Sequence, residues 1–352
     1  MSLKAPNTWL APRSIGLGIA LIALLAPAQE ASKDATFKST VSEVIVPVTV
    51  TDQKGRYLED LDKEDFRIFD NGKEQTIEYF SRERNQPVVV GFLLDLSNSS
   101  RTQWKDYQSA AIDLVDTLLP GDKKFSGYLI GYTTQADLMV NTTSDSEKIV
   151  SRIRTLKPGG GAALYDALYE SITNRTLVKG EPIEPRRVVI IIGDGHDNAS
   201  KKTLDEVLEL AQRELVTVYG VSTSSYGSGN DADDDVLVKL ALATGGKVEY
   251  PLQNVYRDIA GYLQVPTDGG NYAYDLGTGG YATAKFNSIA RAIAHITGEV
   301  TTQYILRYIP DIPVDSKDRR DIRVDVTLPN LQVRARRYYY PFSTAATNTR
   351  SR

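Results

Sequence analysis

The stretch PVVVGFLLDLSNSS, residues 87–100, joins an apolar run to a polar end. A run as short as Val88–Leu94, bounded by turn residues, predicts a strand that is buried on both faces, as in a parallel sheet. Asp95, Ser97 and Ser99 follow the run directly. Because ligands bind just beyond the carboxyl ends of the strands in open parallel sheets, these three side chains are candidate ligand-binding residues. Their oxygen atoms suit Mg²⁺, Ca²⁺ or Mn²⁺ better than zinc.

Strand and helix patterns alternate outward from this run, over residues 87–302, which is typical of an α/β fold with a mostly parallel sheet. A second apolar run, Arg187–Ile192, ends in Gly193-Asp194-Gly195, so Asp194 is expected at the same sheet edge as Asp95. The Gly-rich loop Gly159–Ala163 is expected to converge there as well. Two carboxylates and two hydroxyls, completed by water, can surround a hard cation. The sequence therefore predicts a metal site formed by Asp95, Ser97, Ser99 and Asp194.

Residues 254–284 are predicted to form a long loop or insertion within the α/β domain. Much of this stretch is rich in Gly, Tyr and Asp and lacks periodicity. A long connection of this kind inside a domain is usually functional or disordered. Because it follows the carboxyl end of a strand, we expect it on the same face as Asp95.

The segments on either side of the α/β domain have β character. In residues 37–84, apolar side chains alternate from Val44 to Val50, and Pro47 within this strand indicates a sheet edge. Asn71-Gly72 is a strong hairpin signal. Residues 303–342 return to an alternating β pattern. Because each segment alone is too short to make an independent core, we expect the two to pair into one small β domain, with the α/β domain inserted between them.

The two ends of the chain are expected to lie outside the folded domains. Residues 1–28 combine a positive start, an apolar run at 15–25 and the small-residue sequence Ala26-Pro27-Ala28, which together indicate a secretory signal peptide. The apolar run is shorter than the ~20 residues that a membrane-spanning helix needs. We therefore expect a secreted or periplasmic protein without a membrane span after signal cleavage. Residues 343–352 are polar and predict a flexible tail.

The composition excludes several classes of function. The chain of 352 residues has a net charge of −4 and so lacks the excess of Lys and Arg that binding to nucleic acid requires. It has no cysteine, which rules out disulfides, thiolate catalysis and zinc sites with Cys ligands. With only two histidines, a His-rich metal site is excluded as well.

Three motifs and the two flanks resemble those of a known family. Asp95-x-Ser97-x-Ser99, the segment GGGAALYDAL at 159–168 and the segment GDGHDNAS at 193–200 look like the metal-ion-dependent adhesion site (MIDAS) of a von Willebrand factor type A (VWA) domain. The resemblance covers about residues 87–300. The flanking segments DFRIFDNGKEQTIEYF, residues 65–80, and RARRYYYP, residues 334–341, are similar to the VWFA-related family of secreted bacterial proteins.

The resemblance implies a Rossmann-like sheet, a divalent cation (usually Mg²⁺, with Ca²⁺ or Mn²⁺ as alternatives) and a protein-binding or adhesion role rather than catalysis. It gives metal coordination to Asp95, Ser97, Ser99 and Asp194, with an acidic residue of a protein partner completing the site. Ala162 stands where the family usually has a threonine that coordinates the metal directly or through water. A site with Ala162 is expected to bind metal weakly, to use water instead of the hydroxyl, or to have lost the metal. The alternative function is a metal-free scaffold or complex-assembly protein with the same fold.

The residues of the candidate site and the acidic run also allow other interpretations. The polar residues after Leu94 could cap the next helix, since Ser and Asp favour N-caps, although this does not account for Asp194. A hydrolase with Ser97 as nucleophile and His196-Asp197 as acid–base pair is disfavoured because no activated-nucleophile motif is present. The acidic run at 231–235 lacks the spacing of an EF-hand, which favours a solvated helix start.

Overall fold

The computed structural model describes residues 43–82, 87–121, 124–177, 185–224, 236–251, 277–310 and 318–340. The predicted signal peptide, residues 254–276 of the predicted loop, the acidic run at 231–235 and the predicted tail lie outside these ranges. Within the described ranges, no helix is both long and apolar enough to cross a membrane.

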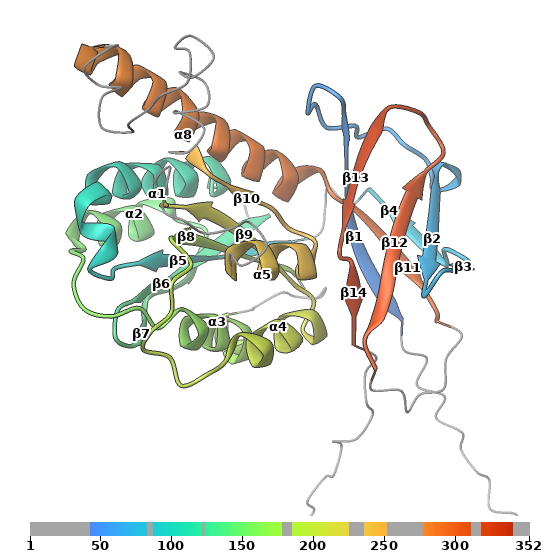
Figure 1. Ribbon diagram of the computed structural model, residues 1–352, viewed down its shortest axis with the longest axis horizontal. Coiled ribbons are helices and arrows are strands. Elements are labelled where there is room, and N and C mark those ends of the chain that lie inside the picture. The colour runs from blue at the N-terminus through green and yellow to red at the C-terminus, as the bar shows by residue number, and fades with distance from the viewer. Residues whose placement is uncertain are drawn as a thin grey trace, which may run out of the picture. The chain divides into compact units, whose positions relative to one another are not determined.

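The α/β domain is built on a six-stranded sheet of order β10-β9-β8-β5-β6-β7 (Figure 1). Neighbouring strands are parallel except β7, which returns antiparallel to β6. The fully buried β5 lies between β8 and β6, as its apolar sequence predicts. The strands are β5 (Val88–Asp95), β6 (Phe125–Tyr132), β7 (Ala136–Thr143), β8 (Arg186–Gly193), β9 (Val216–Ser222) and β10 (Val248–Glu249).

Helices cover both faces of this sheet, so the core has two layers. Val90, Phe92 and Leu94 of β5 pack with α1, α2 and α8 on one face, and Val89 and Leu93 pack with α3, α4 and α5 on the other. The first group comprises α1 (Trp104–Leu118), α2 (Ser146–Thr155) and α8 (Gly277–Thr302); the second comprises α3 (Leu164–Thr173), α4 (Leu204–Arg213) and α5 (Val236–Thr244). Short 3₁₀ turns are η1 (Lys63–Asp65), η2 (Ser99–Gln103) and η3 (Arg175–Leu177). The predicted α/β fold with a mostly parallel sheet is confirmed.

The flanking segments pair into two four-stranded sheets, of order β13-β1-β11-β4 and β14-β12-β2-β3, and each sheet mixes N-terminal and C-terminal strands. All pairings in these sheets are antiparallel. One apolar core, which includes Val46, Ile68 and Leu306, joins them. The predicted pairing of the two flanks is confirmed. The strands are β1 (Val44–Asp52), β2 (Phe66–Asp70), β3 (Lys73–Gln75), β4 (Tyr79–Ser81), β11 (Tyr304–Tyr308), β12 (Arg320–Val326), β13 (Leu331–Ala335) and β14 (Tyr338–Tyr339).

Two expectations for the N-terminal strands need correction. The sheet-edge prediction for β1 is wrong, because β1 lies between β13 and β11. Pairing with β13 begins only at Val48, so Pro47 has a ladder partner on one side alone, Ile305, and proline is tolerated there. The hairpin turn at Asn71-Gly72 is present, with positive φ at both residues, but its second strand is only β3. The chain then crosses to the other sheet, where β4 pairs with β11.

The predicted loop 254–284 is also wrong in its last part, because α8 begins at Gly277 rather than near Phe286. Ala282 and Ala284 are strong helix formers, and they extend the helix toward the N-terminus. Lys285 in the same turn forms an ion pair with Asp106 of α1, which holds this part of α8 against the domain.

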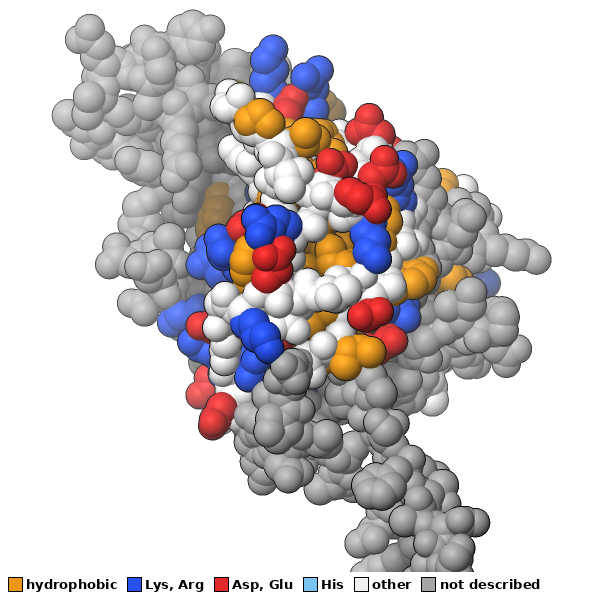
Figure 2. Space-filling view, turned by 90° about the vertical axis from the view of Figure 1, so that its right-hand side faces the viewer, with side chains coloured by type: hydrophobic (Ala, Val, Ile, Leu, Met, Phe, Trp, Pro, Cys, Tyr) orange, Lys and Arg blue, Asp and Glu red, His pale blue; other side chains and the backbone are white. Residues whose placement is uncertain are grey.

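The surface of the β domain that carries β2 and β3 presents charges of both signs. Figure 2 shows Lys and Arg side chains interspersed with Asp and Glu on this face. Arg67 pairs with Glu74 at 2.7 Å, and Arg323 pairs with Asp325 at 2.8 Å. The guanidinium of Arg323 also stacks 4.1 Å from the ring centroid of Phe69. This face is therefore a balanced, solvated surface rather than a patch of one sign.

Candidate metal site

Asp95 is held at the carboxyl end of the buried strand β5, with 2% of its surface exposed. Its Oδ1 accepts a hydrogen bond from the backbone N–H of Ser97 at 2.7 Å. Its Oδ2 is buried and accepts no hydrogen bond from the described residues. Burial raises the pKa of Asp95 to about 6, and the negative charge of Asp194 adds to the rise. The hydrogen bond from Ser97 opposes this rise in pKa, but the net effect still disfavours the charged form of Asp95.

The two predicted serines lie next to each other in the turn after β5. Their hydroxyl oxygens are 2.8 Å apart, with Ser97 buried and Ser99 exposed. Neither acts as a helix cap, because the caps of η2 and α1 are Asn98 and Gln103, without side-chain cap bonds. The N-cap interpretation of these serines is therefore wrong, and their hydroxyls are available for another role.

Asp194 follows β8, the neighbour of β5 in the sheet, and its Oδ1 accepts the backbone N–H of His196 at 2.9 Å. Gly193 just before it allows β8 to lie close to Asp95. A Cβ at Gly193 would stand 2.7 Å from the Cβ of Asp95 and 2.6 Å from the hydroxyl of Tyr132. Glycine at this position therefore lets the two aspartates share one end of the sheet.

The Gly-rich loop joins the two strand ends through hydrogen bonds made by its backbone. Asn98 donates to the carbonyl of Gly160 at 3.1 Å on one side. On the other side, the N–H of Ala162 donates to Oδ1 of Asn198 at 2.9 Å, and its carbonyl accepts the N–H of Asn198 at 2.9 Å. Ala162, which is buried, therefore lies between the segments that carry Asp95 and Asp194, but it contributes no side-chain oxygen.

A family comparison agrees with this arrangement. The model of the von Willebrand factor type A domain matches residues 90–257. This chain carries a VWA domain. No curated protein matches the sequence.

Solved structures show similarity at low sequence identity. BatB of Bacteroides thetaiotaomicron, a conserved hypothetical protein, is 16% identical, with 58% of this chain and 99% of that chain covered and a TM-score of 0.36. Proximal thread matrix protein 1 from the mussel byssus, solved with a zinc-occupied MIDAS motif, is 14% identical, with coverages of 66% and 49% and a TM-score of 0.42. The vWF domain of the type V pili tip protein Mfa5 from Porphyromonas gingivalis is 16% identical, with coverages of 51% and 51% and a TM-score of 0.30.

The structure adds one residue to this end of the VWA domain that the sequence did not reveal. Tyr132 ends β6 and lies opposite Asp95 in the ladder, and its buried hydroxyl has no hydrogen-bond partner among the described residues. Burial raises its pKa well above the ordinary value, and the negative charges of Asp95 and Asp194 act in the same direction. The position of Tyr132 at the end of a third parallel strand, β6, could have identified it in the sequence. Tyrosine is common in buried strands, however, so the residue type alone did not indicate a role.

Asp197 has a local structural role in this VWA domain. Its Oδ2 accepts the N–H of Tyr165, in the first turn of α3, at 3.0 Å and the hydroxyl of Ser200 at 2.5 Å. This carboxylate therefore serves the helix N-terminus, where negative charge is stabilising. The geometry gives no support to an acid–base pair of His196 with Asp197.

The donor atoms present fit a hard divalent cation better than a softer one. The described residues contain no group of three or more His, Cys, Asp and Glu that could hold a metal. The predicted set instead combines the two carboxylates with two neighbouring hydroxyls, and Asp95 keeps a buried oxygen without a hydrogen bond. Oxygen-only sets that leave positions to water are typical of Mg²⁺ sites.

Proposed function

We propose that this chain is a protein-binding module that uses a divalent cation, Mg²⁺ or alternatively Ca²⁺ or Mn²⁺, at the end of its VWA sheet. Asp95, Ser97, Ser99 and Asp194 would hold the cation. When bound, the cation supplies positive charge and an open coordination position for a carboxylate of the partner protein. The four residues orient the oxygen donors at the carboxyl ends of β5 and β8. We further propose that the protein acts outside the cytoplasm, secreted or periplasmic, because of the sequence of residues 1–28.

The observation that carries this proposal is the free, buried Oδ2 of Asp95. A buried carboxylate without a full set of partners is costly in its charged form and is usually neutralised, paired or bound to metal. Asp194 next to it adds negative charge, which makes a cation the fitting partner. The two serine hydroxyls at 2.8 Å from each other supply neutral oxygens beside this charge.

Calorimetric titration of the intact chain with Mg²⁺, Ca²⁺ and Mn²⁺ tests the proposal. Saturable binding of at least one cation is expected in the wild type, and Asp95→Ala should abolish it because a direct ligand is lost. Asp116→Ala is the matched control, since Asp116 is an exposed carboxylate near the C-terminal end of α1, far along the chain's path from the strand ends that carry the site. Binding that is equal in wild type and Asp95→Ala would reject the assignment of the site.

Ala162→Thr should tighten cation binding by about tenfold, the lower end of what one supporting polar group contributes to a metal site. The reason is that position 162 is held between the Asp95 and Asp194 segments by its backbone hydrogen bonds with Asn198. Ala162→Val is the matched control, because valine has the same branched shape without the hydroxyl. Equal affinities in the Thr and Val variants would show that a hydroxyl at this position does not reach the cation.

The alternative is a scaffold that binds its partner without metal, and Ala162 is the observation that favours it. The backbone of the Gly-rich loop is held by hydrogen bonds with the backbone of Asn98 and with the backbone and side chain of Asn198, so its conformation does not depend on a metal ligand at 162. A chain that shows no cation binding, and whose partner binding is unaffected by EDTA, would place this function ahead of the first.

A further inference from the structure

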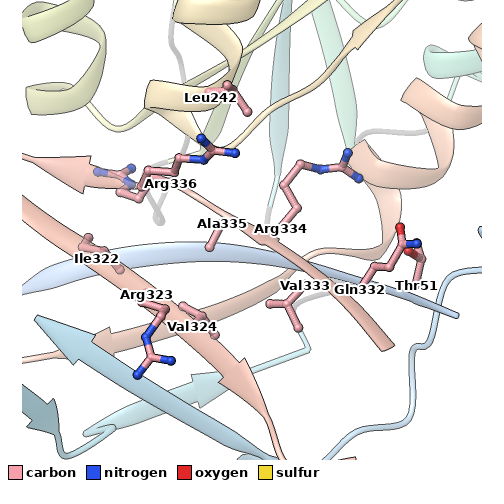
Figure 3. A pocket seen from close by; sticks show the side chains of 11 residues that line it. Thr51, Leu242, Ile322, Arg323, Val324, Gln332, Val333, Arg334, Ala335 and Arg336 are labelled. Carbon is pink, nitrogen blue, oxygen red and sulfur yellow. The ribbon is translucent and has the colours of Figure 1, made fainter. Parts of the chain in front are cut away.

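An arginine-rich pocket lies between strands β12 and β13 of the β domain and helix α5. Its volume is about 370 Å³, which is within the size range of small-molecule sites. Figure 3 shows the side chains of Arg334 and Arg336 extending to the side of β13 where Leu242 of α5 lies, while Arg323 points the other way. The wall is completed by Thr51, Ile322, Val324, Gln332, Val333, Ala335 and Arg337.

Arg336 is the unusual member of this lining. Only 2% of its surface is exposed, and it is among the largest fully buried side chains of the protein. Its Nε and Nη2 are buried and donate no hydrogen bond within the described part of the chain. Burial lowers the pKa of Arg336 to about 10, which still leaves it charged at neutral pH. Burying a charged guanidinium without partners costs free energy, and binding an anion would offset this cost.

The acidic residues near the pocket form ion pairs with arginines other than Arg336. Glu299 forms an ion pair with Arg334, and Asp325 pairs with Arg323 at 2.8 Å. Among the described residues, no carboxylate pairs with Arg336. The pocket therefore has an excess of positive charge on a buried fork of N–H donors, the arrangement that recognises carboxylate and phosphate oxygens.

We propose that this pocket is a binding site for the oxyanion group, carboxylate or phosphate, of a small molecule, with Arg336 as its principal donor. Arg334, on the same side of β13, adds positive charge to the site although it is shared with Glu299. Leu242, Ile322 and Val333 supply an apolar wall for the rest of the ligand. The site is separate from the one at Asp95 and does not depend on a cation.

The binding test uses the intact chain in metal-free buffer with two probes, inorganic phosphate and hexanoate. Calorimetry should show saturable binding of at least one probe. Arg336→Met should abolish it, and Arg336→Lys should weaken it about tenfold or more, because lysine keeps the charge but loses the planar fork. Arg67→Met is the control, since Arg67 lies outside the pocket lining, on the exposed side of β2, where it pairs with Glu74. Hexanoate binding without phosphate binding would identify an organic acid as the ligand class, and the reverse a phosphate.

Thermal unfolding provides a second readout that does not depend on measuring heat. Without anion, Arg336→Met should unfold at the same temperature as the wild type or higher, because a buried unpaired charge is removed. With a saturating probe, the unfolding temperature of the wild type should rise more than that of Arg336→Met. Absence of binding for both probes at millimolar concentration, or binding that Arg336→Met leaves unchanged, would overturn the proposal.

Discussion

Replacing Asp70 by alanine is expected to lower the free energy of unfolding by about 3–5 kcal/mol, the range for breaking a buried ion pair by removing one partner. Asp70 lies at the end of β2 with no exposed surface. Its Oδ1 accepts Nε of Arg320 at 2.8 Å, and its Oδ2 accepts the hydroxyls of Tyr308 at 3.0 Å and Tyr339 at 2.9 Å. Alanine would remove the acceptor that these three donors share inside the protein.

The large loss of stability is expected because the hydrogen-bond partners of Asp70 belong to the other flank of the chain. Asp70 belongs to the N-terminal flank, whereas Arg320, Tyr308 and Tyr339 lie on β12, β11 and β14 of the C-terminal flank. One carboxylate therefore ties together four strands from both β sheets. Tyr308 and Tyr339 are buried, so their hydroxyls cannot turn to bulk water without opening the core.

Urea denaturation followed by circular dichroism measures this effect. Asp70→Asn should lose less stability than Asp70→Ala, because the amide oxygen still accepts hydrogen bonds while the charge facing Arg320 is gone. Glu74→Ala is the control, since Glu74 pairs with Arg67 on the exposed surface of the same sheet, and it should hardly move the denaturation midpoint. A midpoint for Asp70→Ala close to that of Glu74→Ala would contradict a structural role for the carboxylate.

The fold was predictable where burial follows directly from local sequence. The apolar run Val88–Leu94 indicated a central parallel strand, and Asn71-Gly72 indicated a tight turn. What sequence could not show is which sheet a short strand joins. Tyr79–Ser81 follows a hairpin turn, yet it pairs with β11, more than two hundred residues later in the chain. Such a choice depends on the packing of distant strands rather than on periodicity.

For the functional residues as well, the sequence revealed those that follow an apolar strand and missed those whose burial depends on distant segments. Asp95 and Asp194 were found because each follows an apolar strand, and strand ends of parallel neighbours meet. The burial of Asp70 and Arg336 was not foreseeable, since Asp70 directly precedes the turn residues Asn71-Gly72 and Arg336 stands beside other arginines. Their charges are buried by strands and helices contributed from other parts of the chain. For charged residues, burial is a property of the tertiary structure that local sequence does not encode.

A second large effect is expected from Glu299 in the last turns of α8, and it depends on pH. Burial raises the pKa of Glu299 to about 7, against the opposing charges of Arg334 and Lys247. Arg334 donates to Oε1, while Oε2 is buried and accepts no hydrogen bond from the described residues. The folded protein therefore holds a proton on this carboxyl at pH values where the unfolded chain, with a pKa near 4.5, has released it.

The sign of the effect follows from this proton. The native state binds more protons than the unfolded state between the two pKa values, so the free energy of unfolding falls as pH rises from about 4.5 through about 7, and then levels off. The gap between these pKa values corresponds to about 3 kcal/mol. Glu299→Gln should remove this part of the pH dependence, because an amide does not titrate and its oxygen can still accept from Arg334.

Urea denaturation at several pH values between about 5 and 8 separates this contribution from the others. Asp95, whose pKa is also raised, titrates in the same range, so the wild-type profile alone is not specific. The difference between wild type and Glu299→Gln cancels the contribution of Asp95, because that residue is unchanged in both proteins. The variant should gain stability relative to the wild type above about pH 7 and match it more closely near pH 5. Parallel profiles for the two proteins would mean that Glu299 keeps an ordinary pKa, with its charge fully compensated by Arg334.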